Sequence, residues 1–229
     1  MTSIQIDDVR VTFTSKNEHV IALDGVTLSV AAGTVATVFG ASGSGKSTLL
    51  NVAAGLLPVD SGHVLVAGEI LSQAGEASRA RIRLEHIGVI FQENNLVPEF
   101  TALENITLPM RVRGVSAVSA RAQAAGWLER VGMAGLGGRR PGELSGGQRQ
   151  RVGIARALAG NRRVLIADEP TGALDSENSE QIFALLRVLA NDGCAVLVAS
   201  HDGRSKHIAD EVYEKLDGRV AQHRARSVR

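Results

Sequence analysis

The sequence predicts an α/β protein with a mostly parallel core sheet, an antiparallel β part near its N-terminus and an inserted helical lobe. Two observations carry this prediction. Short apolar strands alternate with helices in the second half of the chain, an order typical of a parallel sheet covered on both faces. Residues 101–138, in contrast, are rich in Ala, Leu and Arg at helical spacing and are punctuated by Gly and Pro.

The expected elements follow in chain order. Apolar residues that alternate with polar ones predict a first strand, which carries Ile4, Ile6, Val9, Val11 and Phe13. Further strands are expected at residues 21–30, 34–39, 64–66, 87–91, 163–167 and 195–200, and helices at 48–54, 120–131, 149–159 and 177–191. We expect residues 1–229 to form a single domain in which residues 93–143 are the inserted helical subdomain.

Bulk composition excludes several classes of protein. A net charge of +1 and an aromatic content of 3% argue against binding of nucleic acid. No apolar run approaches the length that spans a bilayer, and the first residues are acidic where a signal peptide is basic, so we expect a cytoplasmic location. The single Cys194 lies in an apolar run and is expected to be buried and unreactive.

Residues 40–48 fit the pattern G-x-x-x-x-G-K-[ST] and lie between an expected strand and an expected helix, the context that this phosphate-binding motif requires. Glycines let backbone N–H groups turn toward a polyphosphate, and the helix directs its positive end at the same anion. Lys46 is expected to reach the β- and γ-phosphates of a nucleotide, and the Ser47 hydroxyl to bind Mg²⁺. The predicted nucleotide contacts are Gly40, Ala41, Ser42, Gly43, Ser44, Gly45, Lys46, Ser47 and Thr48.

Two carboxylates end the apolar strand expected at residues 163–167. Asp168 is the natural partner for a Mg²⁺ held by Ser47, and Glu169 could act as general base toward an attacking water. Ordinary strands also end in acidic residues, so the pair is informative because the phosphate motif accompanies it. A guanine-binding protein would carry an Asn-Lys-x-Asp motif, which the chain lacks, and a small-molecule kinase would have a lid in place of the long helical lobe.

The order of its motifs makes the chain resemble the ATPases of the ATP-binding cassette (ABC) family. The most specific motif is Leu144-Ser-Gly-Gly-Gln148, which matches the family signature at every position. Gln92 is similar to the family's Q-loop residue, residues 173–175 to its D-loop and His201 to its switch histidine. The resemblance covers essentially the whole sequence and implies an ATPase with ATP and Mg²⁺ as ligands. It implies catalytic roles for Gln92, Glu169 and His201, metal ligation by Ser47, Asp168 and Gln92, and nucleotide contacts by Phe13, Ser145, Gly146, Gly147, Gln148 and Asp175.

Two of these assignments have structural alternatives. Phe13 occupies the place where the family has an aromatic ring that stacks on adenine, more often Tyr. It also shares the alternating face of Val9 and Val11, which makes a core position an alternative. His201 follows a buried strand, and a buried structural histidine is the alternative to the family's switch histidine.

The signature motif has the chemistry of an anion site. Ser145 offers a hydroxyl, Gly146 and Gly147 expose their N–H groups, and the helix that follows directs its positive end at the ligand. Because the phosphate loop already surrounds its own nucleotide, the resemblance implies that the signature faces the γ-phosphate bound by a second copy. Two ATP molecules are then buried in a twofold dimer, which opens when hydrolysis removes the γ-phosphate.

Residues 91–109 and 168–175 resemble the subfamily that partners four-helix permeases of the macrolide-export, lipoprotein-release and cell-division types. This resemblance implies an ATPase that dimerises on ATP at the cytoplasmic face of the plasma (inner) membrane and drives a permease with a large extracytoplasmic domain. The cargo would be an amphipathic or hydrophobic molecule such as haem, an antibiotic, an antimicrobial peptide or a lipoprotein. We expect no nucleic-acid partner.

Two alternative functions belong to the same family. An ATPase of this type could drive a cargo-free signalling partner, as in the cell-division branch. A soluble ABC protein acting on DNA or ribosomes is disfavoured, because the interval between Gln92 and Ser145 is too short for a long coiled coil and the chain carries one cassette.

The loop after Gln92 is the expected contact with the permease. We expect residues 93–99, with the apolar Leu96 and Val97, to form the groove for a cytoplasmic helix, and a plain polar surface loop is the alternative.

Overall fold

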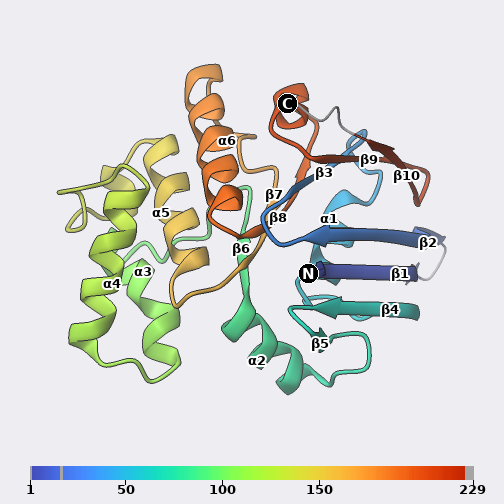
Figure 1. The fold of residues 1–229 in the computed structure, drawn as a ribbon, viewed down its shortest axis with the longest axis horizontal. Helices are drawn as coiled ribbons and strands as arrows, with labels where there is room; N and C mark the ends of the chain where they lie inside the picture. The colour runs from blue at the N-terminus through green and yellow to red at the C-terminus, as the bar shows by residue number, and fades with distance from the viewer. Residues whose placement is uncertain (1, 16–17, 225–229) are drawn as a thin grey trace.

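Two β-sheets and a group of helices make up the protein in the computed structural model, which describes residues 2–15 and 18–224 (Figure 1). The first sheet is antiparallel, has the strand order β2-β1-β4-β5 and lies to the right in the figure. Its strands are β1 (Thr2–Ser15), β2 (Glu18–Ala31), β4 (Ser61–Val66) and β5 (Glu69–Ile70).

The second sheet forms the centre of the molecule and has the strand order β10-β9-β3-β8-β7-β6. All neighbouring strands in it run parallel except β9 and β10, which form an antiparallel hairpin. Its strands are β3 (Val35–Phe39), β6 (Ile87–Ile90), β7 (Val164–Asp168), β8 (Ala195–Ser200), β9 (Glu211–Leu216) and β10 (Arg219–Arg224). The predicted fold class, a mostly parallel sheet with an antiparallel part near the N-terminus, is confirmed.

The strands β3, β6, β7 and β8 each contribute to two hydrophobic cores. On β8, Val196 and Val198 pack into a core shared with the helices α5 (Gly146–Leu158) and α6 (Ser176–Asn191). Leu197 on the same strand faces the other core, which lies around α1 (Lys46–Ala53) and includes β1, β2 and β4. This division follows from the alternation of side chains along a strand and explains why the strands are apolar without a break.

The helical lobe is inserted between β6 and β7. It contains α3 (Ala102–Val112), α4 (Ala117–Arg130) and the short 3₁₀ helix η1 (Pro141–Glu143), and it packs against α5 on the left of the molecule in Figure 1. Ile106, Ala124 and Ile154 come from three different helices of this region and belong to one buried core. Among the helices of residues 2–15 and 18–224, none is both long and apolar enough to cross a membrane.

Two helix starts follow directly from the local sequence. At the start of α3, the Thr101 hydroxyl accepts a hydrogen bond from the backbone N–H of Glu104, whose carboxylate accepts one from the Thr101 N–H. Ser145 and Gln148 make the same reciprocal pair at the start of α5. Both sequences fit the S/T-x-x-E/Q signature of a capping box, which satisfies two N–H groups that a helix end would leave without acceptors.

Three features differ from the expected elements. The helix α2 (Glu76–His86) was not predicted, because its only buried side chain is Ile82 and the apolar periodicity is therefore weak. The hairpin β9–β10 was also not predicted, since its strands carry charged residues throughout. The helices α1 and α5 begin two or three residues earlier than expected, because glycines and a lysine occupy their first turns.

Asn105 joins the helical lobe to the segment that follows β6. The side chain is fully buried, accepts a hydrogen bond from the N–H of Val97 and donates to the carbonyls of Val97, Phe100 and Thr101. One amide therefore holds the loop at residues 97–101 on the first turn of α3.

We expect Asn105→Ala to lower the free energy of unfolding by about 2–4 kcal/mol, because each buried backbone group left without a partner costs ~1–3 kcal/mol. Urea denaturation followed by circular dichroism measures the change. The exposed Gln123→Ala, which removes one surface hydrogen bond on α4, is the matched control. Equal midpoints for the two variants would contradict the prediction.

Candidate functional site

At two positions of the loop between β3 and α1, only glycine fits. A Cβ atom added at Gly40 would lie 2.5 Å from the carbonyl oxygen of Lys215 on β9. One added at Gly45, where φ is +90°, would lie 2.7 Å from the carbonyl oxygen of Ala22 on β2. The loop is therefore in direct backbone contact with two strands, which fixes its position at the end of β3.

Lys46 is the first residue of α1, and its side chain returns to the loop. It is 7% exposed, and Nζ donates hydrogen bonds to the carbonyls of Gly40 and Ala41 at 2.9 and 3.0 Å. The same ammonium lies 3.8 Å from Oε1 of Glu169. It is thus held inside the curve of the loop, within reach of an anion that the loop could bind.

Asp168 and Ser47 offer two oxygen ligands side by side. Oδ1 of Asp168 is buried and has no hydrogen-bond partner among the described residues. Burial raises the pKa of Asp168, and so does the charge of Glu169, whereas a hydrogen bond with Ser47 and the charge of Lys46 lower it. Oδ1 of Asp168 and the Ser47 hydroxyl together fit Mg²⁺, because Mg²⁺ prefers oxygen ligands and would place a positive charge beside the unpaired carboxylate oxygen.

Glu169 links the phosphate loop to the end of β8. Its backbone takes the left-handed conformation, with φ of +45°, and its N–H donates to the carbonyl of Ala199. Oε2 of its carboxylate lies 3.0 Å from Nδ1 of His201. The side chain of His201 is 68% exposed, so the interpretation of this residue as a buried structural histidine was wrong.

Gln92 belongs to the same cluster. It follows β6, and its amide Nε2 would lie 3.3 Å from a Cβ added at Gly172, in the turn that begins at Glu169. The N–H of Gly172 donates to the carbonyl of Glu169. We name Lys46, Ser47, Gln92, Asp168, Glu169 and His201 the phosphate-loop group, because all of them lie close to the ends of adjacent parallel strands or at the start of α1, directly after the loop.

The signature residues form a second group, which lies elsewhere. Gly147 faces Asn178, whose Oδ1 would be 2.6 Å from an added Cβ, and Gly146 faces Leu174 in the same way. Asp175 caps α6 by accepting hydrogen bonds from the backbone and side-chain N–H groups of Asn178, and these bonds lower the pKa of Asp175. We name residues 145–148 with Asp175 the signature group.

The two groups are on different parts of one chain. In Figure 1 the strands β6, β7 and β8 lie between α1, which begins in the phosphate loop, and α5, which begins in the signature. Ser145 at the start of α5 is exposed, and the hydroxyl caps its own helix through Gln148 N–H. The positive end of α5 therefore faces outward, where an anion from outside the chain can approach.

Phe13 lies apart from both groups on the β1–β2 hairpin. It is 46% exposed, whereas Val9 and Val11 on the same strand are buried, and it pairs with the equally exposed Val20. The alternative of a core position was wrong, because β4 pairs with β1 only as far as Arg10, and the end of the β1–β2 hairpin that carries Phe13 extends beyond that pairing. The exposed ring is available for stacking.

The two apolar residues of the loop at residues 93–99 are partly buried and make contacts within the chain. Leu96 packs against the core of the helical lobe, and Val97 is tied to Asn105 through both of its backbone groups. An open groove of about 370 Å³ lies next to this loop, between the end of β6, α3 and α5. Its lining residues are Val89, Phe91, Asn95, Leu108, Pro109, Val112, Arg156, Ala157 and Arg162.

Two residues near the site were missed at the sequence level. Asn178 packs on Gly147, and Lys215 underlies the phosphate loop. Neither belongs to a motif with a recognisable pattern, and the strand that carries Lys215 was itself not predicted. Only the packing of distant segments brings them to the site.

Comparison with protein families agrees with this geometry. The family model described as "ABC transporter" matches residues 23–172, a range that contains the phosphate loop, the signature, Asp168 and Glu169. The chain belongs to the ABC transporter family. It is an ATPase domain of that family, and the predicted binding of ATP agrees with this assignment.

Individual relatives of this ABC ATPase fall into two kinds. The lipoprotein-releasing system ATP-binding protein LolD of Paramagnetospirillum magneticum is 39% identical over 96% of this chain and 97% of its own length. The macrolide export ATP-binding/permease protein MacB 1/2 of Paracoccus denitrificans is 43% identical over 88% of this chain, which is 30% of that protein. Among solved structures, the dimeric ATP-binding cassette MJ0796 bound to ADP and Pi is 34% identical, covers 98% of this chain and 99% of its own, and has a TM-score of 0.89.

We expect Glu169→Gln to bind ATP as the parent does but to hydrolyse it about 10²–10⁴-fold more slowly, the loss that removal of a general base produces. The change keeps the size of the side chain and one hydrogen bond to His201. Nucleotide binding by calorimetry and phosphate release measure the two effects. Glu177→Gln, in the first turn of α6, is the matched control. A near-parental turnover rate would assign the base to another residue.

Proposed function

We propose that this ABC ATPase supplies the energy of a membrane export complex and works with a permease. Similarity over nearly the whole chain to the ATP-binding parts of export systems carries the proposal. The chain pairs with nearly the whole of a LolD protein but with 30% of a macrolide export protein whose name joins an ATP-binding part to a permease. The present chain thus corresponds to the ATP-binding part.

The phosphate-loop group supports hydrolysis of ATP within this complex. Lys46 would exchange the carbonyls of Gly40 and Ala41 for the β- and γ-phosphates, a stronger ligand for an ammonium. Ser47, Asp168 and Gln92 would hold Mg²⁺, which neutralises charge on the β- and γ-phosphate oxygens when bound. Glu169 would take the proton of the attacking water, and His201 would orient the carboxylate of Glu169 through the contact at Nδ1.

The separation of the two groups supports an arrangement in which the signature acts on the partner's nucleotide. The signature of one copy would face the γ-phosphate on the loop of the other, and a twofold pair would bury two ATP molecules. Because the γ-phosphate joins the two chains, the loss of its charge would release them.

Mixing two inactive variants tests this arrangement. A dimer of one Ser145→Arg chain and one Lys46→Ala chain has one site in which an intact loop faces an intact signature. We expect ATP hydrolysis to rise from background to a readily measured rate on mixing. The matched control combines Lys46→Ala with Glu169→Gln, two changes within the phosphate-loop group, which leave no complete site. Equal rates for both mixtures would refute action on the partner's nucleotide.

The groove beside the helical lobe is the surface that we propose for the permease. Leu108 and Val112 are exposed apolar residues on α3, and Arg156 and Arg162 form the floor. Arg156 donates to the carbonyls of Asn94 and Asn95, and burial lowers the pKa of Arg156. Burial and two neighbouring arginines lower the pKa of Arg162 to about 10, and no described residue pairs a carboxylate with either guanidinium. A cytoplasmic helix with an apolar face and a carboxylate would complement this groove.

We expect Val112→Asp to weaken copurification with the permease about 10-fold or more and to remove the permease's stimulation of ATP hydrolysis, since one carboxylate replaces apolar contact area worth about 1–2 kcal/mol. ATP affinity of the isolated subunit should be unchanged. Val118→Asp, on the exposed face of α4 in the same lobe, is the matched control. Parental copurification and stimulation in both variants would exclude the groove as the docking surface.

The relatives suggest an amphipathic or hydrophobic cargo. They include proteins named for lipoprotein release, macrolide export and pyoverdine export. Purification of the chain with its permease in lipid nanodiscs tests export against cargo-free signalling. Stimulation of ATP hydrolysis by a lipopeptide, a macrolide or a siderophore would support export. Stimulation by a cell-wall hydrolase alone would support the signalling alternative.

A further inference from the structure

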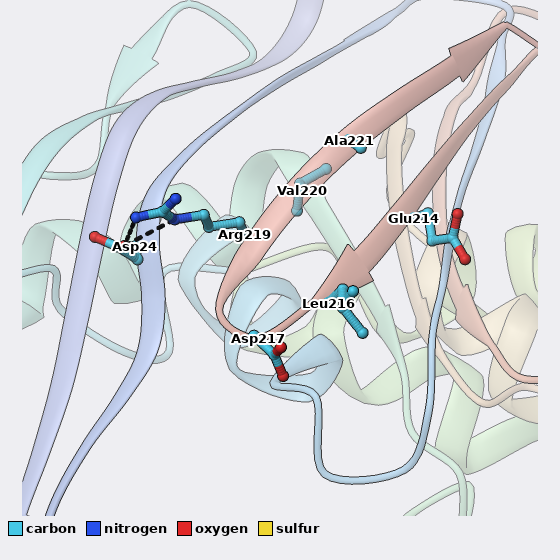
Figure 2. A pocket seen from close by; sticks show the side chains of 7 residues that line it. All are labelled: Asp24, Glu214, Leu216, Asp217, Arg219, Val220 and Ala221. Carbon is cyan, nitrogen blue, oxygen red and sulfur yellow. Dashed lines mark hydrogen bonds and ion pairs between the residues drawn. The ribbon is translucent and has the colours of Figure 1, made fainter.

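Lys215 is a buried lysine directly behind the phosphate loop. It lies on β9 and is 1% exposed. Its neighbours Glu214 and Leu216 point to the other face of the strand. There they line, together with Asp24 on β2, an open pocket of about 520 Å³ (Figure 2). Side chains alternate along a strand, so Lys215 is directed inward, toward the loop.

The side chain of Lys215 reaches the residue that precedes Lys46. A Cβ added at Gly45 would lie 3.1 Å from Cε and 3.3 Å from Nζ of Lys215. Nζ donates a hydrogen bond to the carbonyl of Ala22 at 3.0 Å, the only hydrogen bond from this ammonium within the described residues. The ammonium of Lys215 therefore lies against the side of the loop that faces the sheet, at the N-terminal end of α1.

This buried ammonium lacks a counter-charge within the described chain. Burial alone lowers the pKa of Lys215 to about 8, without a contribution from any charged neighbour. The charged groups on the surrounding elements include Asp24 on β2, Glu211 and Glu214 on β9, Lys46 on α1 and Arg219 on β10. Asp24 is engaged by Arg10 and Arg219, and Glu211 accepts a hydrogen bond from the Tyr213 hydroxyl. Glu214 lies on the opposite face of β9, because side chains alternate along a strand.

We propose that Lys215 is a positioning residue of the nucleotide site, whose ammonium serves as the counter-charge of the bound polyphosphate from behind the glycine loop. A buried charge without a partner destabilises a folded protein, and the anion that the loop is shaped to hold is the charge that would offset this cost. The interaction passes through the backbone of Gly45 and needs no contact with the ligand, because Coulomb attraction is weakly screened where water is excluded. The proposal rests on nucleotide binding and is independent of the export function.

A purely structural lysine would behave differently. If Lys215 only joined β9 to β2 through the Ala22 carbonyl, its removal would destabilise the protein and affect all ligands alike. If it is the counter-charge, Lys215→Met should leave the nucleotide-free protein at least as stable as the parent, since Met fills a similar volume without the buried charge. ATP affinity at pH 7 should nevertheless fall about 10-fold. This is the change expected if bound ATP raises the pKa of Lys215 by about one unit. Adenosine affinity should not change.

The pH dependence of binding supplies a second readout. The pKa of Lys215 in the free protein is lowered to about 8, and a bound polyphosphate would raise it. Below pH 8 Lys215 is charged in both the free and the ATP-bound protein. Above pH 8 Lys215 is neutral in the free protein, so it must take up a proton when ATP binds. ATP affinity of the parent should therefore fall about 10-fold from pH 7 to pH 10 through this group, and Lys215→Met should lack this decrease.

Calorimetric titration of ATP, ADP and adenosine at pH 7 and pH 10, with thermal unfolding of each protein, tests the proposal. Lys206→Met, at an exposed lysine, is the matched control, and Lys46→Ala verifies that binding depends on the loop. ATP-specific weakening of Lys215→Met with retained stability, and a smaller pH effect than in the parent, supports it. Parental ATP affinity, or weakening shared by adenosine, would overturn it. Absence of ATP binding by the parent itself would instead refute nucleotide binding as such.

Discussion

The close backbone contact of one loop with two strands is the constraint on which the rest of the site depends. Gly40 touches the carbonyl of Lys215, and Gly45 touches that of Ala22, so the loop cannot move away from the sheet without losing both contacts. Side chains at these positions would force the loop outward. The loop therefore curves closely over the sheet, and Lys46 directs its ammonium into that curve.

The parallel sheet brings the other groups to this loop. Phe39 on β3 pairs with Ser200 on β8, and Asp168 on β7 pairs with Ala199, so the three strands end at nearly the same level. The residues that follow each strand, Glu169 and His201 among them, must then lie side by side. Such an edge holds polar groups that no single segment could assemble, because the strands come from distant parts of the sequence.

One short turn connects the phosphate-loop group to the signature group. It runs from Glu169 to Asp175 and is closed by hydrogen bonds from Gly172 N–H to the Glu169 carbonyl and from Leu174 N–H to the Thr171 carbonyl. Gln92 contacts this turn from the side of the lobe, and Leu174 contacts Gly146. The two groups and the lobe are thus joined by a few packed residues, as the proposed coupling of hydrolysis to a partner requires.

The sequence by itself determined the local parts of this protein. The phosphate loop, the strand that ends at Asp168 and the capped start of α5 depend on residues that are neighbours in the chain, and so their patterns could be read directly. The mostly parallel sheet followed from the alternation of strands and helices.

Tertiary structure decided the features that depend on contacts between distant segments. The charge beneath the loop comes from Lys215 on a strand too polar to predict. Leu96 is partly buried against the lobe core, and Phe13 is exposed at the end of a hairpin that extends beyond its neighbouring strand. Burial, close contact and register arise from packing, and no local pattern encodes them.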